Sequence, residues 1–92
     1  MRKIEYTSIF KRDFKRIMKK HYEMSKFEDV VELLVENDQE TLVRKYKDHA
    51  LKGNWRGYRE LHLDKDWLLI YKINATKLVL TMVRTGSHDE LL

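Results

Sequence analysis

The C-terminal half of the chain constrains the fold most, because it reads as strands joined by tight turns. Residues 57–63, 67–73 and 77–85 combine apolar alternation with β-branched and aromatic side chains, a pattern typical of β-strands. Asp64-Lys65 and Asn74-Ala75-Thr76 between them have the length and chemistry of hairpin connections. The sequence therefore predicts an antiparallel meander of three strands.

The middle strand of this meander is apolar on both faces. We expect the core face of the sheet to consist of Leu61, Leu63, Leu68, Ile70, Leu78 and Leu80. The side chains expected on the opposite face of the middle strand are Trp67, Leu69, Tyr71 and Ile73. Because both sets are apolar, we predict that this strand is covered on both sides.

The N-terminal half predicts a strand and two helices. Residues 2–6 alternate as a short strand, and Thr7 or Ser8 can then cap a helix that runs to about Lys20. The apolar stripe of that helix is Phe10, Phe14, Ile17 and Met18. We interpret His21 at its end as structural, since a cation near a helix C-terminus interacts favourably with the helix dipole.

A second helix is predicted from the capping-box pattern Ser-Lys-Phe-Glu at residues 25–28, and it extends to about Asn37. Residues 38–56 have no clear period, so we predict a loop there with Gly53-Asn54 as its turn. The expected fold class is α+β: a small antiparallel meander with an N-terminal strand and a two-helix hairpin packed on one face.

Composition narrows the class of protein. With 92 residues we expect a single domain over residues 1–92. The chain has no cysteine, which excludes disulfides and thiolate metal sites and suits a reducing cytoplasm. No apolar run approaches the roughly 20 residues that span a bilayer, and the N-terminus lacks the apolar core of a signal peptide. We therefore expect a cytoplasmic protein that makes no membrane contact.

Charge is strongly segregated along the chain. Residues 1–22 contain eight Lys or Arg residues and two acidic residues. Residues 23–40 contain one Lys and seven acidic residues, and residues 41–92 contain ten Lys or Arg residues and six acidic residues. A basic face beside an acidic helix suits a protein that meets a polyanion on one side only. Within the predicted loop, cations lie among Tyr46 and Trp55, as in surfaces for single-stranded nucleic acid. Alternatively, Trp55 closes the edge of the sheet. The basic residues of the loop are Arg44, Lys45, Lys47, His49, Lys52 and Arg56.

A set of titratable side chains points to acid–base chemistry. His62 alternates away from the neighbouring leucines, and the strand pattern can bring Asp66, Arg84 and His88 to the same end of the sheet, with His49 entering from the loop. Imidazoles and a carboxylate can move protons, and an arginine can stabilise a developing oxyanion. This combination fits cleavage of RNA by attack of the ribose 2′-OH, without a metal.

Three other interpretations use the same residues. The histidines can be ordinary surface or capping residues, or the face can bind nucleic acid without cleaving it. A metal site is the third interpretation, but His49, His62, Asp66 and His88 follow one another at 13, 4 and 22 residues, a spacing that matches no metal motif known to us. We therefore predict no metal ligand and no cofactor.

The ordered residues of this half resemble the YafQ branch of the RelE superfamily, which consists of bacterial toxins of type II toxin–antitoxin pairs. The pattern of that branch is approximately D-H-x-L-x-G-x-W-x-G-x-R-x-x-H-x-x-x-D-W-x-L-x-Y, followed by R-x-G-[ST]-H. The matching residues here are Asp48-His49, Leu51, Gly53, Trp55, Gly57, Arg59, His62, Asp66-Trp67, Leu69, Tyr71, and Arg84-Thr85-Gly86-Ser87-His88.

The resemblance implies a RelE-like fold and a ribosome-dependent mRNA endonuclease. Such a toxin enters the ribosomal A site and cuts the message without a metal, leaving a 2′,3′-cyclic or 3′-phosphate and a 5′-hydroxyl. It implies His88 as general acid and Arg84 as stabiliser of the transition state. Asp66 or His49 is then the base, and His62 orients the base or shares its role. A non-catalytic module that binds RNA or the ribosome is the alternative function.

The resemblance also implies contacts to substrate and partners. Trp67 shapes the pocket, and Leu92 stands near the position where the family often carries an active-site aromatic. Together with basic residues of the predicted loop, the residues expected to bind substrate are Trp67, Arg44, Lys45, Lys47, Lys52, Arg56 and Leu92. A cognate antitoxin is expected to hold the chain in a complex, and this complex binds operator DNA only through the antitoxin.

Overall fold

The computed structural model describes residues 2–20 and 22–91, so the expectations for His21 and Leu92 lie outside the described residues. Its elements follow the chain in the order β1 (Lys3–Tyr6), α1 (Ser8–Met18), α2 (Met24–Glu36), α3 (Gln39–Tyr46), β2 (His49–Ala50), the 3₁₀ turn η1 (Gly53–Trp55), β3 (Arg59–Asp64), β4 (Trp67–Asn74), β5 (Val79–Gly86) and α4 (His88–Leu91). The α+β class is confirmed.

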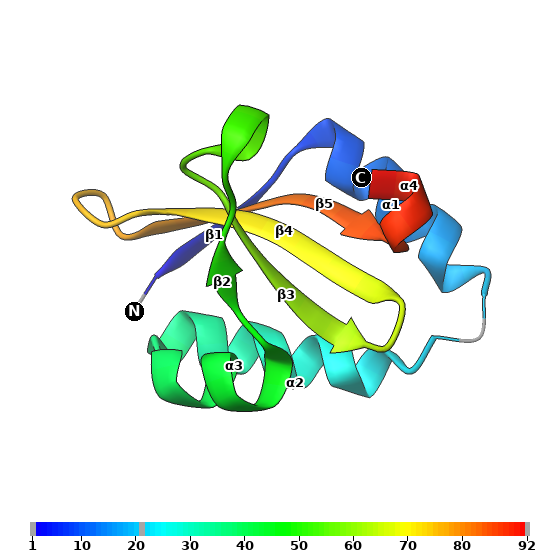
Figure 1. Ribbon diagram of the computed structural model, residues 1–92, viewed down its shortest axis with the longest axis horizontal. Helices are drawn as coiled ribbons and strands as arrows, with labels where there is room; N and C mark the ends of the chain where they lie inside the picture. Colours follow the sequence, from blue (N-terminus) through cyan, green and yellow to red (C-terminus); the bar gives the residue numbers. More distant parts are fainter. Residues whose placement is uncertain (1, 21, 92) are drawn as a thin grey trace.

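The sheet has five strands in the order β1-β5-β4-β3-β2. Strands β3, β4 and β5 form the predicted antiparallel meander. The sheet as a whole is mixed, because β1 runs parallel to β5 at one edge. Parallel pairing requires a crossover connection. The chain makes it through the helices and β2–β4 before it returns as β5 (Figure 1).

Three helices, not two, cover the helical face of the sheet. α1 and α2 meet through Phe14 and Phe27, whose ring centroids lie 5.0 Å apart. The segment predicted as a loop contains α3, which lies beside α2 (Figure 1). Asp38 caps α3 by accepting a hydrogen bond from the Thr41 amide. Only Leu42 and Tyr46 of α3 are buried. Two buried positions are too few to show a helical period, so the sequence pattern did not reveal this helix.

The start of α2 differs from the predicted capping box. The helix begins at Met24 with Glu23 at the N-cap, and no side chain caps it. Ser25 is exposed within the first turn. Starting earlier places Met24 against the main core, where it packs as a partly buried side chain. We infer that this apolar contact decides where the helix begins.

Leu68 and Ile70 were predicted on the same face as Leu61 and Leu63, and this prediction was wrong. The core between sheet and helices contains Leu61, Leu63, Trp67, Leu69, Tyr71, Leu80 and Met82, whereas Leu68 and Ile70 pack with Leu91 in a smaller cluster. Paired residues of antiparallel strands share a face. Leu61 pairs with Leu69 and His62 with Leu68, and this register follows from the irregularity between His62 and Asp64.

Two details at the strand ends complete the fold. Leu78 was expected in the core, but it is exposed and has a left-handed backbone with a φ of 55°. Residues 67–71 of β4 are fully buried, which confirms that this strand is covered on both sides.

Across residues 2–20 and 22–91, no helix combines the length and the apolar character needed to cross a membrane.

Candidate active site

The candidate active site lies on the face of the sheet opposite the main helical core. Glu60 pairs with Ile70, and Ile70 pairs with Arg84, so these three side chains share that face across β3, β4 and β5. His62 is two residues from Glu60 and lies on the same face. The sheet register therefore gathers charged groups from two strands beside the small cluster around Leu68.

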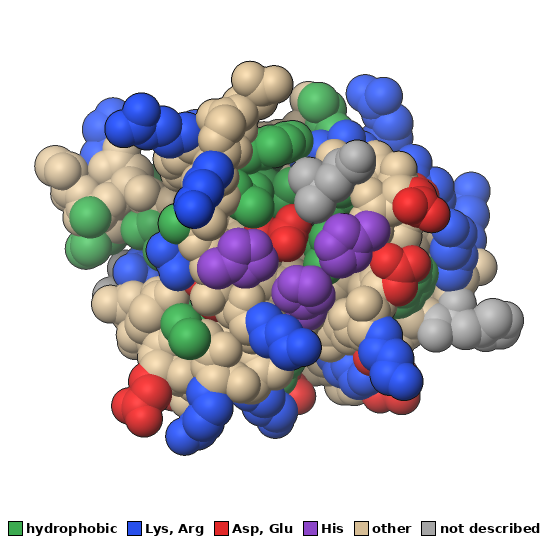
Figure 2. Space-filling model, in the orientation of Figure 1, with side chains coloured by type: hydrophobic (Ala, Val, Ile, Leu, Met, Phe, Trp, Pro, Cys, Tyr) green, Lys and Arg blue, Asp and Glu red, His purple; other side chains and the backbone are tan. Residues whose placement is uncertain are grey.

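Three histidines form a row on this face. The ring centroids of His49 and His62 are 6.2 Å apart, and those of His62 and His88 are 5.8 Å apart. Figure 2 shows the purple imidazoles side by side with acidic side chains among them. His49 and His88 are about half exposed (48% and 51%), whereas His62 is 26% exposed. The structure thus brings His49, His62 and His88 together, whereas the side chain of Arg84 contacts Asp13 on α1.

His49 is positioned by a buried network around Asp48. The Asp48 carboxylate accepts hydrogen bonds from Arg59 Nε at 2.7 Å and from the Tyr71 hydroxyl. Burial raises the pKa of Tyr71, and the hydrogen bond to Asp48 raises it further. His49 Nδ1 lies 2.8 Å from the Lys47 carbonyl oxygen. The motif positions Asp48, Arg59 and Tyr71 are therefore structural, and they fix the backbone that carries His49.

His62 stands at the centre of the row, and its environment favours the neutral ring. Burial lowers the pKa of His62, and the nearby His88, His49 and Lys47 lower it further against the opposing effect of Glu60. A neutral imidazole at this position can accept a proton or orient a neighbouring group.

Glu60 was missed by sequence reasoning. Its carboxylate is 4% exposed, and Oε1 lies 3.5 Å from His49 Nε2 and 3.8 Å from His62 Nε2. A glutamate two residues before a histidine on one strand face is the only signal that the sequence carries, and such spacing is common. His49, Glu60 and His62 are also the described residues whose ligand atoms lie close enough together, within 4.8 Å, to hold a metal ion.

Arg84 is held in place by Asp13, near the edge of the sheet where β1 lies beside β5. Both oxygens of Asp13, on α1, accept hydrogen bonds from its guanidinium at 3.0 Å. Asp13 also accepts from the Thr85 amide at 3.2 Å, where β1 no longer covers β5. Burial opposes ionisation of Asp13, but the hydrogen bonds from Arg84 and Thr85 prevail and hold its pKa below the usual value. Sequence reasoning missed Asp13 as well.

His88 is the first residue of the short helix α4. Its amide donates to Asp66 Oδ1 at 3.1 Å, and its Nδ1 lies 3.8 Å from the same oxygen. Glu90 ties α4 to α1 through a 2.8 Å ion pair with Arg16. The hydrogen bond from the Ser87 amide lowers the pKa of Glu90. Asp66 thus joins the β3–β4 turn to the helix that presents His88.

Trp67 does not reach the site surface. It is fully buried in the main core, and its indole N–H donates to Thr85 Oγ1 at 2.9 Å. Residue 67 begins β4 with its side chain on the helical face, opposite to that of Leu68. Trp67 therefore does not contact substrate as expected. It supports the sheet from the helical side.

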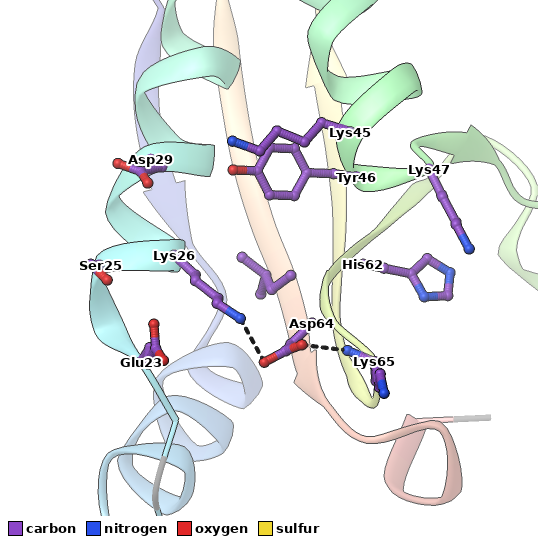
Figure 3. A pocket seen from close by; sticks show the side chains of 11 residues that line it. Glu23, Ser25, Lys26, Asp29, Lys45, Tyr46, Lys47, His62, Asp64 and Lys65 are labelled. Atoms are coloured by element: carbon purple, nitrogen blue, oxygen red, sulfur yellow. Dashed lines mark hydrogen bonds and ion pairs between the residues drawn. The ribbon is translucent and has the colours of Figure 1, made fainter.

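A cleft of about 700 Å³ adjoins His62, and four lysines line it. Lys45 and Lys47 come from the end of α3, as expected of substrate-binding residues, while Lys26 and Lys65 were not anticipated (Figure 3). Lys26 is engaged with Asp64 at 2.8 Å. The remaining cations expected to bind substrate, Arg44, Lys52 and Arg56, are exposed but do not line this cleft.

Trp55 packs on the face of the sheet and not at its edge, where the second interpretation placed it. Its ring meets that of Tyr58 edge-on, with centroids 5.4 Å apart, and both pack against the small cluster around Leu68 and Ile70. The aromatic pair covers part of this sheet face over β4.

Known proteins of similar sequence and structure identify the family of this chain. The sequence profile of the family described as "Bacterial toxin of type II toxin-antitoxin system, YafQ" matches residues 2–92. The mRNA interferase toxin YafQ of Escherichia coli K12 is 42% identical over 90 residues, covering 98% of this chain and 95% of the relative.

Two solved structures have the same fold. The toxin in the E. coli DinJ–YafQ complex is 38% identical, with a TM-score of 0.85 and coverage of 100% of this chain and 99% of that one. A metal-bound toxin from Helicobacter pylori is 39% identical, with a TM-score of 0.88 and full coverage of both chains. The chain therefore belongs to the YafQ family of bacterial toxins of type II toxin–antitoxin systems.

Proposed function

We propose that this protein is an mRNA endonuclease that cuts the message in the ribosomal A site and so inhibits translation. The observation that carries the proposal is the row of His49, His62 and His88 on one sheet face, with Arg84 anchored on the same face. The name of the E. coli K12 relative, an mRNA interferase toxin, supports the same class of activity.

The proposed reaction is attack of a ribose 2′-OH on the adjacent phosphorus. His49 or Asp66 removes the hydroxyl proton, and His88 protonates the leaving 5′-oxygen. Arg84 stabilises the charge that develops on the phosphate. Protein side chains supply every proton and charge in this scheme, so we propose that cleavage is metal-independent. The lysines of the cleft beside His62 bind the phosphates that flank the cut.

The proposal extends to partners and setting. The DinJ–YafQ complex supports a cognate antitoxin for this chain, and operator DNA is then bound only through that antitoxin. Residues 1–92 act as one RelE/YafQ-like domain, and the protein works in the cytoplasm, where messages and ribosomes meet.

Primer extension on a defined message in a purified translation system tests the function. We expect discrete cuts that require ribosomes, and we expect His88→Ala to reduce them by roughly 10²-fold or more. Products should carry a 5′-hydroxyl, and a chelator selective for transition metals should leave the rate unchanged. Inhibition of translation without cuts would instead identify a non-catalytic module that binds RNA or the ribosome.

A further inference from the structure

Four charged side chains connect α4 to β5 through α1. Glu90 Oε2 on α4 lies 2.8 Å from Arg16 Nε, and the guanidinium of Arg16 donates a 3.1 Å hydrogen bond to Asp13 Oδ1. Asp13 in turn accepts two hydrogen bonds of 3.0 Å from Arg84. The signs alternate along this charge chain, which consists of Glu90, Arg16, Asp13 and Arg84. Figure 1 shows α4 beside α1, the helix that supplies the two central members. The charge chain therefore joins the helix that begins with His88 to the strand that carries Arg84.

Glu90 also fixes the start of α4. Residues 87–90 form a capping box, in which the Ser87 amide donates to Glu90 Oε1 at 2.9 Å and the Glu90 amide donates to Ser87 Oγ at 3.3 Å. α4 has only four residues, too few to be stable without contacts to the rest of the protein. One oxygen of Glu90 thus fixes the backbone around His88, and the other oxygen ties that backbone to α1.

Arg16 is the main cation that holds Glu90. Its Nε is buried and has no hydrogen-bond partner of good geometry among residues 2–20 and 22–91, so the carboxylate 2.8 Å away compensates it. Lys20 Nζ lies farther from the same oxygen, at 4.0 Å, on a half-exposed side chain that water screens. The hydrogen bond from the Ser87 amide lowers the pKa of Glu90, and Arg16 lowers it further against the effect of burial. Glu90 is therefore ionised at neutral pH and attracts Arg16.

The direction of the His88 ring depends on the backbone that carries it. The side chain is half exposed, and its Nδ1 is 3.8 Å from Asp66 Oδ1, which is beyond hydrogen-bond distance. The His88 amide, by contrast, donates to the same oxygen at 3.1 Å. The ring is therefore aimed by the start of α4, which Asp66 holds from the β3–β4 turn and Glu90 holds from α1.

We propose that Arg16 and Glu90 are positioning residues that keep His88 and Arg84 in one relative arrangement. The proposal rests on the proposed function, in which His88 protonates the leaving 5′-oxygen while Arg84 stabilises charge on the same phosphate. Both groups must reach one phosphorus centre, and a displacement of about 1 Å can cost on the order of 10²-fold in rate. Arg16 contacts Asp13 and Glu90 at once, so it couples the support of Arg84 to the support of His88.

The location of the pair distinguishes positioning from binding. Neither Arg16 nor Glu90 lines the cleft beside His62, whose lysines are proposed to bind phosphates. Loss of the pair should therefore lower kcat and leave KM for the programmed ribosome nearly unchanged. Glu90→Gln isolates the ion pair, because the amide oxygen of Gln can still accept from the Ser87 amide while the charge is lost.

Cleavage rates in the purified translation system, measured at several concentrations of programmed ribosomes, test the proposal. We expect Arg16→Gln and Glu90→Gln each to lower kcat by about 10-fold, with KM within about threefold of the wild type. The two losses should not multiply in the double variant, since either change breaks the same link. Arg12→Gln and Asp89→Asn are the matched controls at exposed positions of α1 and α4, and they should keep kcat within about twofold.

Nuclear magnetic resonance of the isotope-labelled full chain gives a second readout that does not depend on cleavage. We expect Arg16→Gln and Glu90→Gln to shift the amide and imidazole resonances of His88, while those of His49 at the other end of the row stay in place. Arg12→Gln should move neither set. Circular dichroism and urea midpoints check that each variant is folded, and Glu90→Gln provides the test even where Arg16→Gln does not fold.

Three kinetic outcomes would overturn the proposal. The first is a wild-type kcat in both single variants, and the second is a raised KM at unchanged kcat, which would assign the pair to RNA binding. The third is a loss of about 10²-fold in the double variant, which would show that Arg16 and Glu90 act independently. If the wild type does not cleave at all, the proposed function fails. Unmoved His88 resonances in both single variants would then refute the positioning of His88 separately, and shifted resonances would uphold it.

Discussion

Asp13 on α1 holds the guanidinium of Arg84 on β5 through two hydrogen bonds of 3.0 Å, across 71 residues of sequence. The same carboxylate accepts from the Thr85 amide at the point where the edge strand β1 ends. One buried group thus closes the edge of the sheet and fixes the cation proposed to stabilise the transition state. Packing of α1 and placement of Arg84 are therefore coupled.

Replacing Asp13 by Asn should affect both stability and cleavage. Loss of the buried charge leaves Arg84 unpaired, which we expect to lower the free energy of unfolding by about 3–5 kcal/mol. A displaced Arg84 should also slow cleavage by up to about 10²-fold in the fraction that remains folded. Urea unfolding and primer extension measure the two effects. Glu28→Gln, at an exposed carboxylate, is the control, and an unchanged unfolding midpoint in Asp13→Asn would contradict the coupling.

The stability contributed by Asp13 should disappear in acid. Its pKa is lower in the folded protein than the value of about 3.9 expected in the unfolded chain. A carboxyl with a depressed folded pKa contributes stability that is fully present above the unfolded pKa and is lost as the pH falls through the folded value. We therefore expect the difference in free energy of unfolding between wild type and Asp13→Asn to shrink as the pH falls below about 4. Urea titrations at several pH values, followed by tryptophan fluorescence, test this, and a constant difference would argue against it.

Trp67→Phe should lower stability without removing the chemistry. The ring is fully buried, and its N–H donates to Thr85 Oγ1, which itself donates to the Leu68 carbonyl. Phe keeps most of the apolar contact but loses the hydrogen bond and leaves space behind, so we expect a loss of about 1–3 kcal/mol. Cleavage by the folded variant should stay within a few-fold of the wild type. A large loss of activity at full stability would restore a direct role for Trp67 in substrate binding.

What the sequence could predict depended on local pattern. The meander follows from alternation and turn chemistry, and so do the apolar stripes of the helices, except that Met18 is exposed. The strand pattern also indicated that His62 and His88 lie at the same end of the sheet, but the pairing of β2 with β3 that brings in His49 was not predicted. The face of Leu68 and Ile70 did not follow, because the irregularity between His62 and Asp64 sets the register and leaves no clear sequence signal.

The missed charges have a different cause. Asp13 acts on Arg84 across 71 residues, and Glu60 acquires its partners only when β2 pairs with β3 and brings His49 opposite it. Neither contact follows from a regular spacing of residues in the sequence. Buried polar groups of this kind become visible only once the tertiary contacts are known.

The lysines around the cleft should govern binding of RNA. Lys47 and Lys65 line the cleft with His62, so replacing either by Ala should weaken RNA binding. Each replacement should remove about one phosphate contact. The slope of the logarithm of affinity against the logarithm of salt concentration should then become shallower by roughly 0.7. Lys77→Ala is the matched control, since the β4–β5 turn lies at the opposite end of the strands from the β3–β4 turn. Binding of a catalytically inactive His88→Ala background to single-stranded RNA at several salt concentrations measures the slope. An equal effect of Lys77→Ala would indicate a diffuse charge effect with no specific role for the cleft.

Asp66 can be tested as a base or as a positioning residue. Its side-chain oxygen accepts a hydrogen bond from the His88 amide, and the side-chain oxygen of an Asn could accept the same hydrogen bond. The side chain is 68% exposed and lies in a turn, as suits a group that holds the start of α4. We therefore expect Asp66→Ala to slow cleavage by about 10- to 10²-fold, and Asp66→Asn to recover most of that loss. Primer extension at matched protein concentration compares the two. If Asn is as poor as Ala while both proteins stay folded, the carboxylate itself takes the proton, and Asp66 rather than His49 is the general base.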